Sequence, residues 1–208
     1  MAETVRAFVA VQIAEEVADA LWQVQDTLQS LPAMADLRWV EPEDSHITLK
    51  FLGDTPIPRL PAIVAALDSV AERWEPFIAQ FGPLGAFPNV HRPNNVWLGI
   101  SQGEKPFQHL YNAIEVALKK LGIKPERRDF HAHLTLARVP KAWTDAQRRA
   151  AGELIGPTEL PEVPPFTVDA VALIRSVLTP EGSEYTRLAN SLFGKEAPLQ
   201  DDEWEDIP

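Results

Sequence analysis

The sequence predicts an α+β fold with two lobes, in which two pseudo-symmetric, mainly antiparallel sheets are flanked by helices and enclose a central cleft. The 208-residue chain has 45% hydrophobic and 24% charged residues, the proportions of a soluble globular protein with its own core. Patterns typical of strands and helices follow one another in a similar order in both halves of the chain. Turn-forming residues separate the late strands, as in antiparallel hairpins.

In the first half, runs of β-branched and aromatic residues or helically spaced apolar residues mark each element. Acidic residues in its first turn favour the first helix, and Gly53 with Asp54 ends the second strand. A short apolar piece, residues 37–40, lies between these two elements. The expected strands are residues 4–13, 45–52, 76–87 and 95–100, and the expected helices are residues 14–31 and 59–74.

The second half is expected to repeat this order. Gly122 is the stop signal of its first helix, and Thr144 is the N-cap of its second. The turn-forming residues 179–182 separate the last two strands. The expected helices are residues 105–121 and 144–155, and the expected strands are residues 130–139, 166–178 and 184–193. We therefore expect one bilobal domain over residues 1–195.

The net charge of −11 restricts the partners that the chain can bind. Binding to long stretches of phosphate backbone depends on a basic surface, so we expect no binding to long duplex nucleic acid. Part of the charge is local, because residues 196–208 carry six acidic and no basic residues, and we expect a disordered tail there. The rest of the chain is mildly acidic, and a few focused donors suffice to hold a small anion.

The chain has no cysteine, which excludes disulfides, thiolate metal sites and cysteine nucleophiles. This composition fits a reducing compartment, and no signal peptide is recognisable, so we expect a cytoplasmic protein. No apolar stretch is long enough to cross a membrane. We expect a monomer without a cofactor or a metal ion.

The same pattern, His-any-Thr-Leu, stands on a predicted strand in each half, beginning at His46 and at His133. Strand alternation places the histidine and threonine of each copy on one face and their apolar neighbours in the core. If the lobes face each other about a pseudo-twofold axis, the side chains of His46, Thr48, His133 and Thr135 meet in one cleft. The structural alternative is that each histidine fills a strand edge and each threonine reflects strand propensity. Two copies in matching strands favour a functional site.

These groups suit attack on a phosphodiester. The pKa of histidine, about 6.5, allows one imidazole to act as a neutral base and the other as a protonated acid. On opposite sides of phosphorus, they activate water and protonate the departing oxygen in line. Threonine hydroxyls donate hydrogen bonds to the non-bridging oxygens. This chemistry requires no metal ion.

With these motifs the chain resembles the two-histidine phosphoesterases, specifically the bacterial and archaeal RNA 2',3'-cyclic phosphodiesterases, also called 2'-5' RNA ligases. The resemblance covers residues 4–193. Ala132 is a departure, because the family usually has proline before the second motif histidine; its loss frees a backbone dihedral angle and restores an N–H group. The matching segments are residues 6–10, 46–53, 87–88, 96–99, 130–138 and 176–178, with Tyr185.

The resemblance implies a bilobal α+β fold and hydrolysis of a 2',3'-cyclic phosphate at an RNA end to a 2'-phosphate. It implies that His46 is the proton donor, that His133 is the proton acceptor, and that Thr48 and Thr135 hold the phosphate. Arg138 matches a family arginine near the phosphate. Plain alternation puts Arg138 on the face opposite His133, so a bulge or the strand end is needed to bring it round.

Several alternatives stay open within this assignment. Some family members join RNA halves through a 2'-5' linkage, and a sister activity acts on cyclic nucleotides or 2'-5' oligoadenylate. The implied partners are accordingly RNA ends or small cyclic-phosphate nucleotides. A protein of a different class would bind RNA ends without turnover, although binding alone does not need two titrating groups.

Other residues are weaker candidates for function. His131 and His133 have a spacing that allows metal ligation from one strand face, but no third ligand is evident. Residues 91–92 lie in a polar loop where they can meet RNA. Phe51 or Trp97 is a candidate for stacking on a base at the edge of the cleft.

Overall fold

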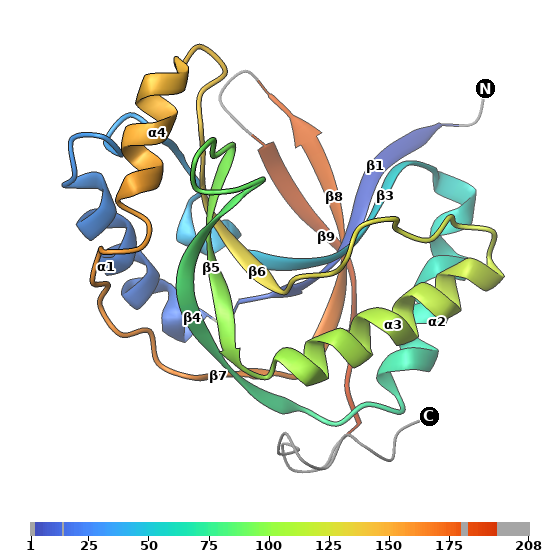
Figure 1. Ribbon diagram of the computed structural model, residues 1–208. Coiled ribbons are helices and arrows are strands. Elements are labelled where there is room, and N and C mark those ends of the chain that lie inside the picture. The colour runs from blue at the N-terminus through green and yellow to red at the C-terminus, as the bar shows by residue number, and fades with distance from the viewer. Residues whose placement is uncertain (1–2, 14, 180–182, 195–208) are drawn as a thin grey trace.

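The computed structural model describes residues 3–13, 15–179 and 183–194. These residues form a curved antiparallel sheet in the order β7-β4-β5-β6-β3-β1-β8-β9, with β2 paired to β6 (Figure 1). The strands are β1 Thr4–Gln12, β2 Arg38–Trp39, β3 His46–Pro56, β4 Phe77–Phe87, β5 Asn95–Gln102, β6 His133–Arg138, β7 Phe166–Val168, β8 Ala170–Leu178 and β9 Ser183–Leu192. The helices are α1 Ala18–Gln29, α2 Leu60–Ala71, α3 Glu104–Lys120 and α4 Asp145–Glu153, with 3-10 turns η1 Glu15–Val17, η2 Pro42–Asp44 and η3 Ile57–Arg59.

The predicted α+β class is confirmed, and the sheet divides into two halves that meet where β6 pairs with β3. One half is β7-β4-β5-β6 and the other is β3-β1-β8-β9. Each half contains strands from both halves of the sequence, so the two halves of the sheet are not the two halves of the chain.

A second connection between the sheet halves replaces the single strand expected at residues 166–178. The chain pairs with β4 as β7, passes through Asp169, and then pairs with β1 as β8. The expected strand is therefore interrupted, because the segment changes its partner strand at that residue.

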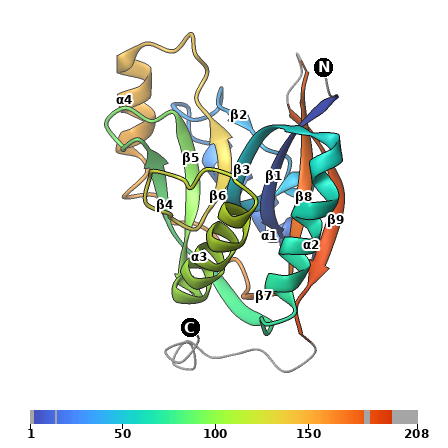
Figure 2. The same cartoon turned by 90° about the vertical axis from the view of Figure 1, so that its right-hand side faces the viewer.

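The helices lie in two pairs. Helix α2 contacts β8 and β9, and Figure 1 shows α1 and α4 together on the other side of the molecule from α2. Helix α3 follows β5 in the sequence but contacts α2 and β3 (Figure 2). It is fixed there by Lys50 of β3, whose Nζ lies 2.6 Å from Glu115 Oε1 of α3 and donates to the Lys124 carbonyl at 2.8 Å.

The two faces of the sheet have different surroundings. Apolar side chains of all four helices and of one sheet face form a single core, which includes Leu21, Ile63, Phe107 and Ala151. The other sheet face, which we call the open face, carries a small separate apolar cluster formed by Phe8, Ala10, Ala172 and Ile174. Polar side chains that need access to a ligand can therefore stand on the open face.

Local signals placed most element ends within a few residues. Gly122, with φ of 76°, follows the end of α3, and Thr144 caps α4 in a capping box with Gln147. The expected end of a strand at Gly53 and Asp54 is wrong, because β3 continues to Pro56 beside β1 and Gly53, with φ of 67°, lies within it.

Parts of the sequence-based description lie outside the described residues. These are residues 180–182 of the last turn and the acidic residues 196–208. Within the described part of the chain, no helix is long and apolar enough to span a membrane.

Candidate active site

The two His-any-Thr motifs lie on neighbouring strands, because β3 pairs with β6 and Ile47 stands opposite Leu134. Both of these apolar residues are buried in the core, as expected. The antiparallel register places each motif histidine across from the threonine of the other motif, half-buried on the open face. The facing pairs are His46 with Thr135 and His133 with Thr48.

A β-bulge in β6 brings Arg138 to the face that carries the motifs. Thr135 and Ala137 stand opposite adjacent residues of β5, so Leu136 is an extra residue. Leu136 and Ala137 are both buried, and Arg138 is exposed. After the extra residue, the side chains of β6 point to the opposite faces from those that plain alternation predicts. Arg138 therefore lies on the same face as His133.

The Arg138 side chain crosses to the other half of the sheet. Its guanidinium lies 3.5 Å from Ser183 Oγ and 3.4 Å from Tyr185 Oη, both on β9. Its positive charge acts on His46. A positive group thus stands beside the motif of β3, although it belongs to β6.

The motif strand β3 has a bulge at the corresponding position. Thr48 and Lys50 stand opposite adjacent residues of β1, so Leu49 is the extra residue. Lys50 is consequently buried with the core, and Phe51 turns to the open face, where 64% of it is exposed and its ring centroid lies 6.1 Å from that of Phe8. Phe51 and Arg138 therefore occupy equivalent positions, five residues after their motif histidines.

Each motif imidazole is oriented by a backbone carbonyl two residues earlier. Nδ1 of His46 lies 2.7 Å from the Asp44 oxygen, and Nδ1 of His133 lies 2.7 Å from the His131 oxygen. A carbonyl oxygen only accepts, so Nδ1 carries the hydrogen in both rings. Nε2 is then the nitrogen left for proton transfer.

Two aromatic rings flank each imidazole. His46 lies 4.9 Å from Phe8 and 5.0 Å from Tyr185, and His133 lies 4.9 Å from Phe87 and 5.9 Å from Trp97, all between ring centroids. Tyr185 and Phe87 meet the imidazoles edge-on. These contacts restrict the ring orientations, and the pairing of strands that creates them is not visible in the sequence alone.

The pKa of each motif histidine lies below its usual value. Burial lowers the pKa of His46, the Asp44 carbonyl opposes this, and the charges of Arg138 and His133 lower it further. Burial also lowers the pKa of His133, with an opposing effect of the His131 carbonyl and a smaller lowering by the His131 ring. An anionic phosphate between the rings would raise both pKa values.

A cavity of about 580 Å³ is lined by the end of β1, by residues 165–170 and by β9. Its lining includes Gln12, which stands opposite His46 across β1 and β3, and Arg187 and Asn190 of β9. Arg187 Nη1 donates to Gln12 Oε1 at 3.1 Å. The cavity gives polar groups next to His46 but does not contain the motif residues.

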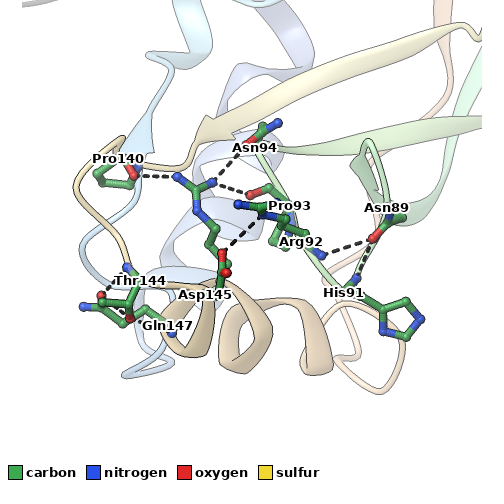
Figure 3. A network of polar contacts seen from close by, with 10 residues as sticks. Asn89, His91, Arg92, Pro93, Asn94, Pro140, Thr144, Asp145 and Gln147 are labelled. Atoms are coloured by element: carbon green, nitrogen blue, oxygen red, sulfur yellow. Dashed lines mark hydrogen bonds and ion pairs between the residues drawn. The ribbon is translucent and has the colours of Figure 1, made fainter.

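The other candidate residues lie in different settings. His131 is exposed, and the described residues contain no group of three or more histidine, aspartate or glutamate side chains arranged to hold a metal ion. In the loop before β5, Arg92 pairs with Asp145 of α4 at 3.2 Å, and the N–H groups of residues 91–92 donate to Asn89 (Figure 3).

Figure 3 also shows how this loop is held against α4. The Arg148 guanidinium donates to the Pro93 carbonyl, the Asn94 side chain and the Pro140 carbonyl. Figure 3 labels these three acceptor residues. The loop before β5 and the segment after β6 are thereby joined to the same helix. The contacts of residues 91–92 connect them to this network and not to the two motifs.

The family model of the 2'-5' RNA ligase superfamily matches residues 17–179. The chain belongs to this superfamily. Within it, the chain is 39% identical over 182 residues to the RNA 2',3'-cyclic phosphodiesterase of Methanothermobacter thermautotrophicus, covering 88% of this chain and 95% of that one. It is 34% identical over 186 residues to the enzyme of the same name from Archaeoglobus fulgidus, covering 88% and 97%.

Solved structures share the superfamily fold. A protein from Thermus thermophilus superposes with a TM-score of 0.71 at 29% identity, covering 92% of this chain and 100% of that one. E. coli LigT in complex with 3'-AMP superposes with a TM-score of 0.72, covering 93% and 100%; at 22% identity, this likeness concerns the fold alone. The family resemblance of the sequence is confirmed.

Proposed function

We propose that this superfamily member hydrolyses 2',3'-cyclic phosphates at RNA or oligonucleotide ends to 2'-phosphates, with its two His-any-Thr motifs and without a metal ion. The observation that carries the proposal is the β3–β6 register, which puts two imidazoles and two hydroxyls on one face. The relatives named RNA 2',3'-cyclic phosphodiesterase support the substrate class. Base, acid and phosphate donors are then all side chains of the protein.

In the proposed reaction, Nε2 of His133 accepts a proton from water as the water oxygen bonds to phosphorus. The bond between phosphorus and O3' breaks, and protonated Nε2 of His46 gives its proton to O3'. The products are a free 3'-hydroxyl and a 2'-phosphate. The hydroxyls of Thr48 and Thr135 donate to the non-bridging oxygens, and Arg138 offsets their negative charge.

Product identification tests the reaction. Adenosine 2',3'-cyclic phosphate incubated with the protein in excess EDTA should give adenosine 2'-phosphate, measured by chromatography against both monophosphate standards. Complete loss of turnover in EDTA, restored by one added metal, would contradict the two-histidine mechanism. Absence of turnover on cyclic mononucleotides and on cyclic-ended RNA would instead favour an RNA-end binding protein.

The roles of the histidines are separable by leaving group. A general acid matters when the departing oxygen is a poor leaving group, as O3' of ribose is, and matters little for p-nitrophenolate. His46→Ala should lose roughly 10²–10⁴-fold activity on the cyclic phosphate but regain much of its relative rate on an activated aryl phosphodiester. His133→Ala should remain slow on both substrates, because water still needs its base.

The opposite result of the leaving-group experiment would reverse the assignment of acid and base. Rescue of His133→Ala, and not of His46→Ala, by the better leaving group exchanges the donor and acceptor roles. If neither substitution slows hydrolysis of the cyclic phosphate by about tenfold, the active site lies elsewhere.

A ligation reaction is a second candidate, supported by the name of the matching family model. The 5'-hydroxyl of a second RNA would take the place of water, with the same base, acid and leaving oxygen, and the product would contain a 2'-5' linkage. Mixing an RNA with a 2',3'-cyclic end and an RNA with a 5'-hydroxyl measures the ratio of joined to hydrolysed product.

A further inference from the structure

A second arginine lies beside Arg138 on the open face. Strand β2 pairs with β6 so that Arg38 stands opposite Arg138 and Trp39 opposite Ala137. Trp39 packs against the core, so Arg38, its neighbour along the strand, points to the other face. Directly opposite residues of an antiparallel pair share a face, and Arg38 is exposed.

Neither of these two arginines forms an ion pair with an acidic side chain in the part of the chain that the structure describes. Like charges directly opposite each other destabilise a sheet. The hydrogen bonds of Arg138 go to the neutral hydroxyls of Ser183 and Tyr185. Within residues 3–13, 15–179 and 183–194, Arg38 has no side-chain hydrogen bond and no ion pair. An exposed guanidinium without a carboxylate partner is suited to binding a phosphate group.

The position of the two arginines relative to the motifs indicates which phosphate groups of a substrate they can reach. Strand β5 occupies one edge of β6, so β3 and β2 occupy successive parts of its other edge, opposite Leu134 and Arg138. On β5, which has no extra residue here, the matching positions are Leu98 and Asn95, so three residues at about 3.3 Å each separate them by roughly 10 Å along the strand. One nucleotide together with an extended arginine side chain spans such a distance.

We propose that Arg38 binds the phosphate on the 5' side of the terminal nucleotide, while Arg138 serves the cyclic phosphate at its other end. This inference rests on the proposed function. The 5' phosphate is present in an RNA chain and absent from a nucleoside 2',3'-cyclic phosphate. Arg38 therefore makes the protein prefer RNA ends to free cyclic mononucleotides, although the chain as a whole is acidic.

Three substrates test the proposal: adenosine 2',3'-cyclic phosphate, the same compound with a 5'-phosphate, and the dinucleotide ending in a cyclic phosphate. The wild-type protein should show a kcat/KM about tenfold higher on the last two, because each adds the same phosphate. Arg38→Gln should lose this advantage while its kcat/KM on the first substrate stays within about twofold. Arg38→Lys should keep part of this advantage, because the lysine ammonium keeps the positive charge but lacks the planar guanidinium that binds a phosphate with two hydrogen bonds.

A control variant and a measurement without turnover complete the test. Arg149→Gln removes an exposed arginine of α4 and should keep the advantage. In titration calorimetry, the wild-type protein should bind adenosine 2',5'-bisphosphate about tenfold more tightly than adenosine 2'-phosphate, and Arg38→Gln should bind both equally.

Equal losses on all three substrates, or a wild-type protein indifferent to the 5'-phosphate in both measurements, would overturn the role of Arg38. Turnover of the unphosphorylated cyclic nucleotide would in that case still support the proposed function. Absence of turnover with a retained, Arg38-dependent preference for the bisphosphate would reject the proposed activity and keep the phosphate site.

Discussion

Arg138 is one of the residues of β6 that act on the motif of β3. It leaves β6, contacts two hydroxyls of β9, and places its charge near His46 of β3. The edge of the Tyr185 ring faces the same imidazole. The electrostatic surroundings of His46 therefore depend on a side chain of β6, and the orientation of its ring depends on a side chain of β9.

Removal of this charge should raise the pKa of His46. Burial is the main cause that lowers it, so Arg138→Gln should bring the pKa only partly back toward about 6.5. The sign follows from Coulomb repulsion, because a neighbouring cation disfavours the protonated imidazole. NMR titration of the imidazole resonances in the free protein measures the shift.

His133 is the internal control for this titration. Burial lowers its pKa, the His131 carbonyl opposes this and the His131 ring lowers it further, so the named causes are burial and His131. Arg138→Gln should therefore move the His133 resonances along nearly the wild-type curve. A pKa of His46 that falls or stays constant in the variant would contradict the placement of the guanidinium.

At the scale of the strands, β3 and β6 each contain a β-bulge at the same position of the motif. Each bulge comes at the motif leucine, Leu49 or Leu136, and moves the residue two positions later to the open face. Those residues are Phe51 and Arg138, one aromatic and one cationic. The two motif strands thus have the same bulge but place different side chains on the open face.

A glycine of β4 leaves room for the tryptophan ring that contacts His133 of the second motif. Gly85 stands opposite Trp97 of β5, and a Cβ atom at Gly85 would overlap with the indole ring. The same indole contacts Phe87 and His133. Close packing of this ring on the β4 backbone therefore fixes one side of the imidazole.

Gly85→Ala should displace the indole and lower kcat/KM on a cyclic nucleotide about tenfold, with a stability loss of about 1–3 kcal/mol from overpacking. Shifted NMR resonances of the His133 ring would locate the effect. Gly156→Ala is the control, because a Cβ atom there has nothing within 4 Å. Unchanged His133 resonances and activity in Gly85→Ala would show that the indole does not position the imidazole.

For the molecule as a whole, α3 connects parts that are distant in sequence. It follows β5, yet the buried pair of Lys50 and Glu115 holds it against β3. The two side chains are only 3% and 13% exposed, so neither charge is well hydrated if its partner is removed. Lys50 also belongs to the bulge that turns Phe51 to the open face.

Lys50→Met should lower the free energy of unfolding by about 3–5 kcal/mol, because Glu115 stays buried without its partner. The double variant Lys50→Met with Glu115→Met should recover most of this loss. Urea-induced unfolding at neutral pH measures both. Arg92→Gln is the contrasting case, since the pair of Arg92 and Asp145 is 71% and 74% exposed and its loss should cost at most about 1 kcal/mol. A similarly small effect of Lys50→Met would refute the importance of the buried pair.

The sequence by itself determined the features that depend on local patterns. Helical spacing and Gly122 defined α3 nearly to the residue, and Thr144 marked the start of α4. The two His-any-Thr motifs identified the superfamily and indicated which side chains share a strand face. These signals are contained in a few neighbouring residues, so they need no knowledge of the partners of a strand.

Only the tertiary structure decided the arrangements that depend on strand pairing. Arg138 reaches the open face through a bulge, which forms because two residues of β6 stand opposite one position of β5. The same holds for the aromatic contacts of His46 and for Arg38 opposite Arg138, which join segments far apart in the sequence. Alternation along one strand has period two whatever its neighbours are, whereas register and bulges are properties of a pair of strands.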